Sequence, residues 1–204
     1  MLQLALYLSS KFYVLRSMKM NAKQLRDLPE TEAKSHLVSL KRRPVYFILE
    51  NVYDTYNIGG LFRLADALNI ERMYLCGDME TPPNHKIAKA SIGTYKIVPW
   101  VYKSSAAEAI AELRSQYSAV SDQKLTTDSR PRITILAVEQ SKDSVDYGEA
   151  DYSLPVALIL GNETSGVTEA TLKLCDQIVE IPMWGINTSL NVIVSAAIVA
   201  YSFI

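Results

Sequence analysis

The sequence predicts an α/β protein in which a mostly parallel sheet is flanked by helices. Short apolar runs rich in strand-forming residues alternate with segments whose apolar residues recur at helical spacing. The runs at 45–50, 133–139 and 156–160 are apolar almost throughout, which is typical of strands that are covered on both faces. Strands and helices that alternate in this way favour parallel pairing, with helices packed on both sides of the sheet.

The expected elements follow one another along the whole chain. Two short helices are predicted within 21–40, where Pro29 suits a first helical turn. The predicted strands are 45–50, 72–76, 95–101, 133–139, 156–160 and 178–181. The predicted helices after them are 57–68, 87–90, 106–117, 168–175 and 190–202. Polar stretches at 121–131, 140–153 and 182–188 are predicted to be loops.

The length of 204 residues is accounted for by one α/β domain over 45–204, preceded by a basic helical extension over 1–44. The formal net charge of the chain is -1, but the extension carries a clear excess of Lys and Arg over Asp and Glu. Phosphate groups are neutralised by such residues, so a nucleic-acid partner is expected at this end of the chain. The alternative is an ordinary solvated helix face.

The cysteines and the N-terminal stretch indicate the cellular compartment in which the protein is expected. Cys76 and Cys175 are far apart and form no metal-ligand pattern, so we expect two reduced, partly buried thiols and no metal site. The apolar stretch 2–8 lacks the features of a signal peptide and is too short to span a bilayer, so a cytoplasmic protein is expected. Residues 1–17 are either an over-extended gene model or a tail that orders on a neighbour.

The first segment that departs from a purely structural pattern is 57–63, at the start of a predicted helix. Gly59 and Gly60 leave backbone N–H groups open to an anion or to a close ligand. Arg63 lies in an otherwise apolar helix face, and a buried guanidinium needs a partner or a cleft. We expect Arg63 to be functional, with a salt-bridged structural arginine as the alternative.

The second segment, 158–166, runs from a buried strand into a polar loop flanked by glycines. Open α/β sheets bind their ligands at the carboxyl ends of parallel strands. The loop has neither the GK[ST] ending of a P-loop nor the GxGxxG fingerprint, so a phosphate-loop nucleotide site is disfavoured.

The third segment, 181–191, precedes a helix rich in small residues, which pack closely on another backbone or on a partner subunit. The backbone groups and apolar walls of its loop suit an adenine.

Together the three segments closely resemble the motifs of the SpoU/TrmH branch of the SPOUT RNA methyltransferases, over residues 45–202. The matching patterns are N-x-x-x-x-x-R, then G-N-E-x-x-G, then IPM-x-G-x-x-x-SLN followed by an alanine-rich helix. The resemblance implies a SAM-dependent transfer of a methyl group to a ribose 2′-hydroxyl of tRNA or rRNA, by a homodimer without a metal. It also implies that the C-terminal part of the sheet forms a deep trefoil knot, an exception to the rule of unknotted chains.

The resemblance also assigns residues to the site, position by position. The reacting centre would be surrounded by Asn57, Arg63, Glu163, Ser189 and Asn191. S-adenosylmethionine would be held inside the knot by Glu139, Leu160, Gly161, Asn162, Gly166, Ile181, Met183, Gly185 and Leu190. The site would lie at the dimer interface, with the last helix as the dimer contact.

The family assigns activation of the hydroxyl to Arg63, but an arginine is a poor proton acceptor. We therefore expect Arg63 to stabilise the developing alkoxide and to hold the adjacent phosphate. A non-catalytic RNA-binding protein with the same fold is an alternative, but Arg63, Glu163 and Asn191 are all present. A nicotinamide-dependent oxidoreductase would need GxGxxG after the first strand, and 57–63 does not provide it.

Overall fold

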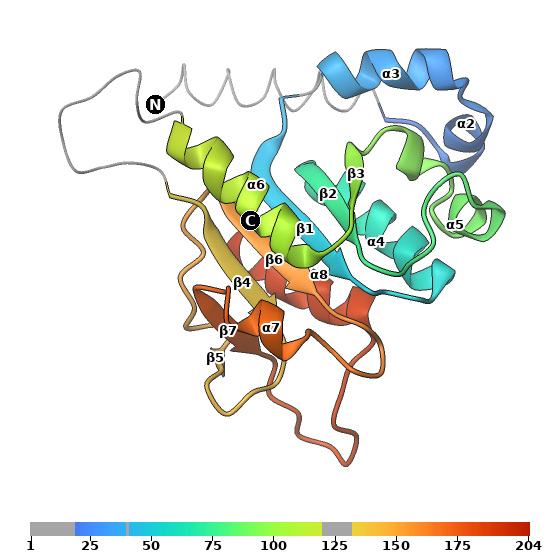
Figure 1. Ribbon diagram of the computed structural model, residues 1–204. Coiled ribbons are helices and arrows are strands. Elements are labelled where there is room, and N and C mark those ends of the chain that lie inside the picture. Colours follow the sequence, from blue (N-terminus) through green and yellow to red (C-terminus); the bar gives the residue numbers. More distant parts are fainter. Residues whose placement is uncertain (1–18, 40, 120–131) are drawn as a thin grey trace, which may run out of the picture.

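The computed structural model describes residues 19–39, 41–119 and 132–204, which form one seven-stranded sheet with flanking helices (Figure 1). The strand order is β3-β2-β1-β6-β4-β7-β5, and every pairing between these strands is parallel. The strands are β1 (Arg43–Glu50), β2 (Ile70–Cys76), β3 (Trp100–Lys103), β4 (Thr134–Val138), β5 (Val145–Asp146), β6 (Val156–Leu160) and β7 (Gln177–Glu180). The predicted fold class is confirmed.

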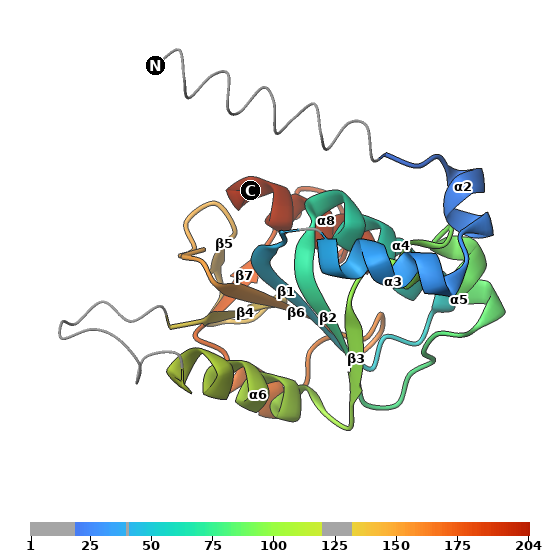
Figure 2. The same cartoon turned by 90° about the horizontal axis from the view of Figure 1, so that it is seen from above.

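Helices cover both faces of this sheet, as Figure 2 shows. One face carries α4 (Thr55–Leu68) and α8 (Val192–Phe203), and α5 (His85–Ala90) packs against α4. The other face carries α6 (Ala106–Ala119) and α7 (Glu169–Leu172). Parallel strands that are buried on both sides explain why the central runs of the sequence are apolar without alternation.

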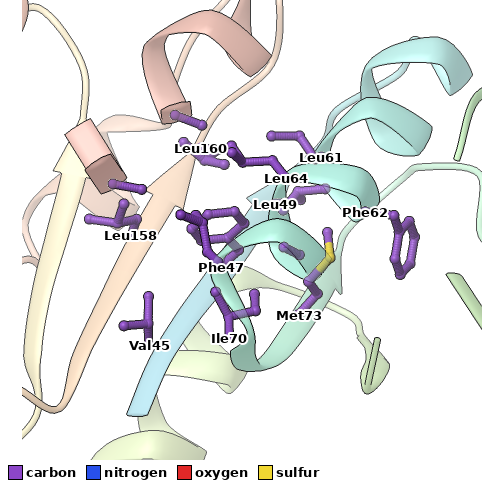
Figure 3. Close-up of a cluster of buried hydrophobic side chains, with 14 of the residues drawn as sticks. Val45, Phe47, Leu49, Leu61, Phe62, Leu64, Ile70, Met73, Leu158 and Leu160 are labelled. Carbon is purple, nitrogen blue, oxygen red and sulfur yellow. The ribbon is translucent and has the colours of Figure 1, made fainter. Parts of the chain in front are cut away.

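Successive side chains of β1 point to opposite faces of the sheet and join two separate parts of the core. Val45, Phe47 and Leu49 point toward α4 and α8, where Figure 3 shows them among side chains of the helices and of β6. Tyr46 and Ile48 point to the opposite face, toward α6. All five side chains are at most 2% exposed, and burying each apolar side chain of this size contributes about 1.5–3 kcal/mol. The core therefore fixes β1 and β6, whose carboxyl ends lead into the polar segments.

The predicted strand 95–101 is wrong over its first five residues. The chain forms the 3₁₀ helix η1 (Thr94–Lys96) there, and β3 begins only at Trp100. Gly93 has a left-handed φ of 93° that starts this turn, and its Cβ position lies 2.5 Å from the carbonyl oxygen of Leu25. The Lys96 ammonium donates to the carbonyls of Arg26 and Leu28, each at 2.9 Å. The segment is thus shaped by contact with the N-terminal helices.

Two other differences concern short elements. The predicted loop 140–153 contains β5, which consists of two residues and exists only through its pairing with β7. The predicted helix 168–175 is limited to α7 (Glu169–Leu172), with Thr168 as its N-cap. The predicted loop 121–131 lies outside the described residues, as do residues 1–18.

The described part of the N-terminal extension forms the two predicted helices, α2 (Ala22–Asp27) and α3 (Glu30–Ser39). Asn21 caps α2, and its backbone N–H in turn donates to the side chain of Gln24, which completes a capping box. Leu25, Leu28 and Ala33 are buried, so these helices pack on the domain. The proposed division of the chain after residue 44 stays a prediction.

Both cysteines are free thiols, as predicted. Burial raises the pKa of Cys76 and of Cys175 to about 12, which leaves both as poor nucleophiles at neutral pH. Within the described ranges, no helix has the length and apolar character needed to cross a membrane. No cluster of three or more His, Cys, Asp or Glu side chains in those ranges is suited to hold a metal ion.

Candidate active site

A cavity of about 520 Å³ opens at the carboxyl ends of β4, β6 and β7. Its lining contains ten of the predicted site residues: Glu139, Gly161, Asn162, Glu163, Gly166, Ile181, Met183, Ser189, Leu190 and Asn191. Two predicted cofactor residues are absent from it. Leu160 is 1% exposed and belongs to the core, and Gly185 lies in open space, with no atom within 4 Å of its Cβ position. The structure thus gathers the second and third motifs around one cavity.

The loop after β6 approaches itself closely. A Cβ at Gly161 would lie 2.2 Å from the carbonyl carbon of Gly166, which no side chain can tolerate. Gly166 itself has a left-handed φ of 67°, and backbone hydrogen bonds join it to Asn162 in both directions, at 3.1 and 2.9 Å. The side-chain oxygen of Asn162 accepts from the backbone N–H groups of Thr164 and Ser165. These contacts define one conformation of the loop.

Two carboxylates hold the far end of the same loop. Glu139 accepts a hydrogen bond from the backbone N–H of Val167 at 2.9 Å. Glu50, at the end of β1, is 6% exposed and accepts from both the backbone N–H and the hydroxyl of Thr168, at 2.8 and 3.0 Å. Sequence reasoning identified Glu139 but missed Glu50. The only signal for Glu50 was a carboxylate that ends an apolar strand.

A chain of hydrogen bonds joins all three motifs. Asn57 donates from its side-chain nitrogen to Glu163 at 2.9 Å, and its side-chain oxygen accepts from the amide of Asn191 at 2.9 Å. Asn191 also caps α8, accepting from the backbone N–H of Ile193. Asn57 is 6% exposed, so it does not line the cavity but supports two residues that do. We call Glu163, Asn57 and Asn191 the amide relay.

The Glu163 carboxylate has further donors besides Asn57. It accepts from the backbone N–H groups of Tyr53 and Asp54, at 3.1 and 3.0 Å. Burial raises the pKa of Glu163, but the hydrogen bonds from Asn57 and from the backbone outweigh burial, and the pKa lies below its ordinary value. Glu163 is therefore held as a carboxylate at the start of α4.

Glu163→Gln should make the protein less stable near neutral pH and less sensitive to acid. Because the folded-state pKa is lowered, the bonds of Glu163 contribute fully above the unfolded-state pKa of about 4.3 and are lost as the pH falls from there toward the folded-state value. Urea unfolding at about pH 7 and about pH 4 should show a smaller stability difference in the variant than in the wild type. The exposed Glu149→Gln is the control; an equal pH dependence in all three proteins would contradict the role of Glu163.

The loop between β7 and α8 is attached to the cavity by a residue that sequence reasoning missed. Gln140, directly after Glu139, donates from its side chain to the carbonyl of Thr188 at 2.6 Å. Ser189 follows Thr188, lines the cavity and keeps an exposed side chain. At the tip of the loop, Trp184 and Ile186 are almost fully exposed, at 94% and 103%.

Arg63 lies away from the cavity of its own chain, so the cleft expected for it is not formed within one chain. Its side chain is exposed and makes no ion pair with any described residue. On α4, Gly59 faces Ala90 of α5 and Gly60 faces Ile193 of α8, and Arg63 lies between these two directions. Asn57 points about 120° away from Arg63 around the helix. One chain therefore does not bring Arg63 to the amide relay.

Comparisons with known proteins identify the family of the chain. The SpoU rRNA Methylase family model matches residues 44–201. The tRNA (guanosine(18)-2′-O)-methyltransferase of Escherichia coli is 30% identical over 156 residues, which is 75% of this chain and 59% of the relative. The 23S rRNA (guanosine-2′-O-)-methyltransferase RlmB of Neisseria meningitidis is 29% identical over 80% of this chain and 59% of the relative. The chain thus spans about three fifths of the length of these two relatives.

Solved structures show the same fold. The SpoU methyltransferase AviRb from Streptomyces viridochromogenes, solved with AdoMet, superposes with a TM-score of 0.69 at 25% identity, over 81% of this chain and 61% of AviRb. The A. aeolicus TrmH/SpoU tRNA modifying enzyme has a TM-score of 0.66 at 24% identity, over 89% of this chain and 79% of the enzyme. Because the family model covers most of the chain and its motif residues converge on one cavity and its amide relay, this protein belongs to the SpoU rRNA Methylase family.

Proposed function

We propose that this protein transfers a methyl group from S-adenosylmethionine to a ribose 2′-hydroxyl of tRNA or rRNA. The observation that carries the proposal is the cavity, which is shared by the second and third motifs and tied to the first by the amide relay. The relatives support it, since they are named as guanosine-2′-O-methyltransferases of tRNA and of 23S rRNA.

The cavity suits S-adenosylmethionine in size and chemistry. Its volume falls in the range of small-molecule sites, about 300–1,000 Å³. Ile181, Met183 and Leu190 provide apolar contact for an adenine, whereas Glu139 and Gln140 offer polar groups for the charged part of the ligand. Gly161 keeps the loop backbone free of a side chain at this point. When bound, the cofactor would supply the activated methyl group.

The chain's own residues would orient the ribose and stabilise the charge that develops on its reacting oxygen. The amide relay fixes Glu163 and Asn191 at the cavity, and Ser189 adds an exposed hydroxyl. Holding two reacting groups in contact can lower the barrier by several kcal/mol. The 2′-hydroxyl would pass its proton to water or to a phosphate oxygen of the RNA as its oxygen bonds to the methyl carbon and S-adenosylhomocysteine leaves. The guanidinium of Arg63, a poor proton acceptor, would stabilise the negative charge that develops on the oxygen.

Because Arg63 does not reach the cavity of its own chain, we infer a homodimer in which Arg63 of a second copy completes the site. Leu190, Val194 and Tyr201 are 39%, 45% and 58% exposed and recur at helical spacing along and just before α8. Such an apolar stripe is costly to leave in water. Gly60 packs on Ile193, so the exposed side of α4 that carries Arg63 lies beside this stripe.

Val194→Asp should shift the protein from dimer to monomer, because each interface would then bury two unpaired carboxylates. Sedimentation velocity measures the change. Leu154→Asp, at an apolar side chain before β6 that is 51% exposed against 45% for Val194, is the matched control. A wild type that sediments as a monomer, or a dimer unaffected by Val194→Asp, would contradict the proposed interface.

We also infer the trefoil knot of the family. β7 lies between β4 and β5 in the sheet, and the chain after it returns through the loop 182–190 to place α8 against β4 and β6. A C-terminal segment that is threaded through the chain requires two features. Its strand, here β7, is inserted between strands that come earlier in the sequence, and the helix after it, here α8, packs back against the sheet.

The proposed activity is tested with tritiated S-adenosylmethionine and unmodified transcripts of the organism's own tRNAs and rRNA. After transfer, the RNA is digested to nucleosides and separated. Tritium in a 2′-O-methyl nucleoside is the expected result. Tritium in a base-methylated nucleoside would replace the proposed acceptor, and RNA binding without any transfer would support a non-catalytic RNA-binding protein instead.

A further inference from the structure

A second hollow, also of about 520 Å³, opens at the carboxyl ends of β2 and β3. It is lined by Gly77, Asp78, Met79, Thr81, Tyr102 and Ser104, none of which lines the cofactor cavity. We call it the β2–β3 hollow. Its position at the carboxyl edge of the sheet puts it on the same side of the molecule as the candidate active site (Figure 1).

The walls of the β2–β3 hollow are fixed by hydrogen bonds. The backbone N–H of Gly77 donates to the carbonyl of Lys103 at 3.1 Å, and that of Asp78 donates to the side chain of Asn51 at 2.9 Å. Gly77 has a left-handed φ of 81°, and a Cβ there would lie 2.2 Å from the side-chain oxygen of Asn51. The hollow is therefore preformed.

An exposed aromatic ring forms part of this wall. Tyr102 lies on β3 and is 51% exposed. Covering an aromatic ring with a partner is favourable, because the ring has a large apolar surface. An unpaired nucleobase offers a flat surface that stacks on such a ring, with about 1–3 kcal/mol for each stacked base.

The β2–β3 hollow is joined to the candidate active site through the loop after β1. Asn51 holds Asp78, and Tyr53, two residues later, donates its backbone N–H to Glu163. Two residues span at most about 7 Å. A nucleotide near the one whose ribose lies at Glu163 is thus within reach of the hollow. Tyr53 has a side chain that is 56% exposed, so a second ring lies on this path.

The charges around the β2–β3 hollow favour a base over a phosphate. The side chain of Asp78 is exposed at its wall, and a carboxylate repels phosphate but accepts hydrogen bonds from the amino groups of bases. Lys86 and Lys89 are exposed on α5, shortly after the hollow in the chain, and form no ion pair with another described residue. They are available for the backbone phosphates of the same strand.

We propose that the β2–β3 hollow receives an unpaired base of the substrate RNA, stacked on Tyr102, close to the nucleotide that is methylated. The inference rests on the proposed function, because it assumes an RNA substrate. It assigns Tyr102 to RNA binding, separately from the cofactor cavity and from the amide relay.

Steady-state kinetics of Tyr102→Ala and Tyr102→Phe test this assignment, with the RNA transcript and S-adenosylmethionine varied in turn. Loss of one stacking contact should raise the KM for RNA about tenfold in Tyr102→Ala. The kcat and the KM for S-adenosylmethionine should stay within about twofold, and Tyr102→Phe, which keeps the ring, should behave as the wild type. Leu154→Ala is the matched control, since Leu154 is also 51% exposed but lies before the amino-terminal end of β6, whereas the hollow lies at the carboxyl ends of the strands.

Photocrosslinking gives an independent readout that a structural role of Tyr102 would not produce. Transcripts in which uridine is replaced by 5-iodouridine should crosslink to the segment containing Tyr102, as mapped by mass spectrometry. An unchanged KM for RNA in Tyr102→Ala, or crosslinks confined to other segments, would overturn the inference while wild-type methyl transfer continues. Absence of transfer by the wild type would instead count against the proposed function.

Discussion

Arg63→Ala is expected to abolish methyl transfer while the affinity for S-adenosylmethionine stays within a few-fold of the wild-type value. Arg63 is not among the residues proposed to contact the cofactor, so its removal should leave those contacts in place. The reaction would lose the charge that stabilises the oxygen, and removal of one such group costs about 10²- to 10³-fold in rate. Parallel calorimetry and tritium-transfer assays measure the two effects, and loss of cofactor binding would refute the assigned role.

Complementation between variants tests whether Arg63 acts across the dimer. Asn191→Ala damages the amide relay of its own chain but keeps Arg63, and Arg63→Ala does the reverse. In a mixed dimer, one site then has both an intact relay and an arginine from the second copy. Co-expressed variants should therefore recover activity that neither has alone. An inactive mixture that contains mixed dimers would show that Arg63 acts within one chain.

Gly161→Ala should abolish cofactor binding and destabilise the protein by about 1–3 kcal/mol. The added methyl group would lie 2.2 to 2.5 Å from backbone atoms of Gly166 and Val167, so no side-chain movement relieves the contact. The loop must then move away from the cavity that it lines.

Calorimetry with S-adenosylmethionine and urea unfolding measure these two effects of Gly161→Ala. Gly185→Ala is the control for stability, since nothing lies within 4 Å of its Cβ position. Wild-type cofactor affinity in Gly161→Ala would mean that the loop after β6 does not form the cofactor site.

Most of the fold could be predicted because its patterns are local. β6 is apolar throughout, and α4 repeats its apolar residues at helical spacing, so both were recognised from neighbouring residues alone. η1 and β5 were missed because each depends on a distant partner: Lys96 binds carbonyls at the end of α2 and next to it, and β5 pairs with β7. Contacts across such sequence distances leave no periodic signal.

In the candidate site too, local motifs could be predicted but contacts between distant residues could not. Its motifs indicated which loops meet, and the cavity contains residues from both of the later motifs. The sequence could not show that Asn57 joins Glu163 to Asn191, since more than a hundred residues separate it from each. Nor could it show that Arg63 turns outward, because its apolar neighbours on α4 suggested burial while the direction of α8 was unknown.

A crystal structure of the protein with S-adenosylhomocysteine is the most direct test of the whole account. The predicted result is a dimer in which the ligand contacts Gly161, Ile181 and Leu190, with Arg63 of the second copy at the mouth of the same cavity. A ligand bound elsewhere, or an Arg63 that faces only solvent in the assembled dimer, would contradict it.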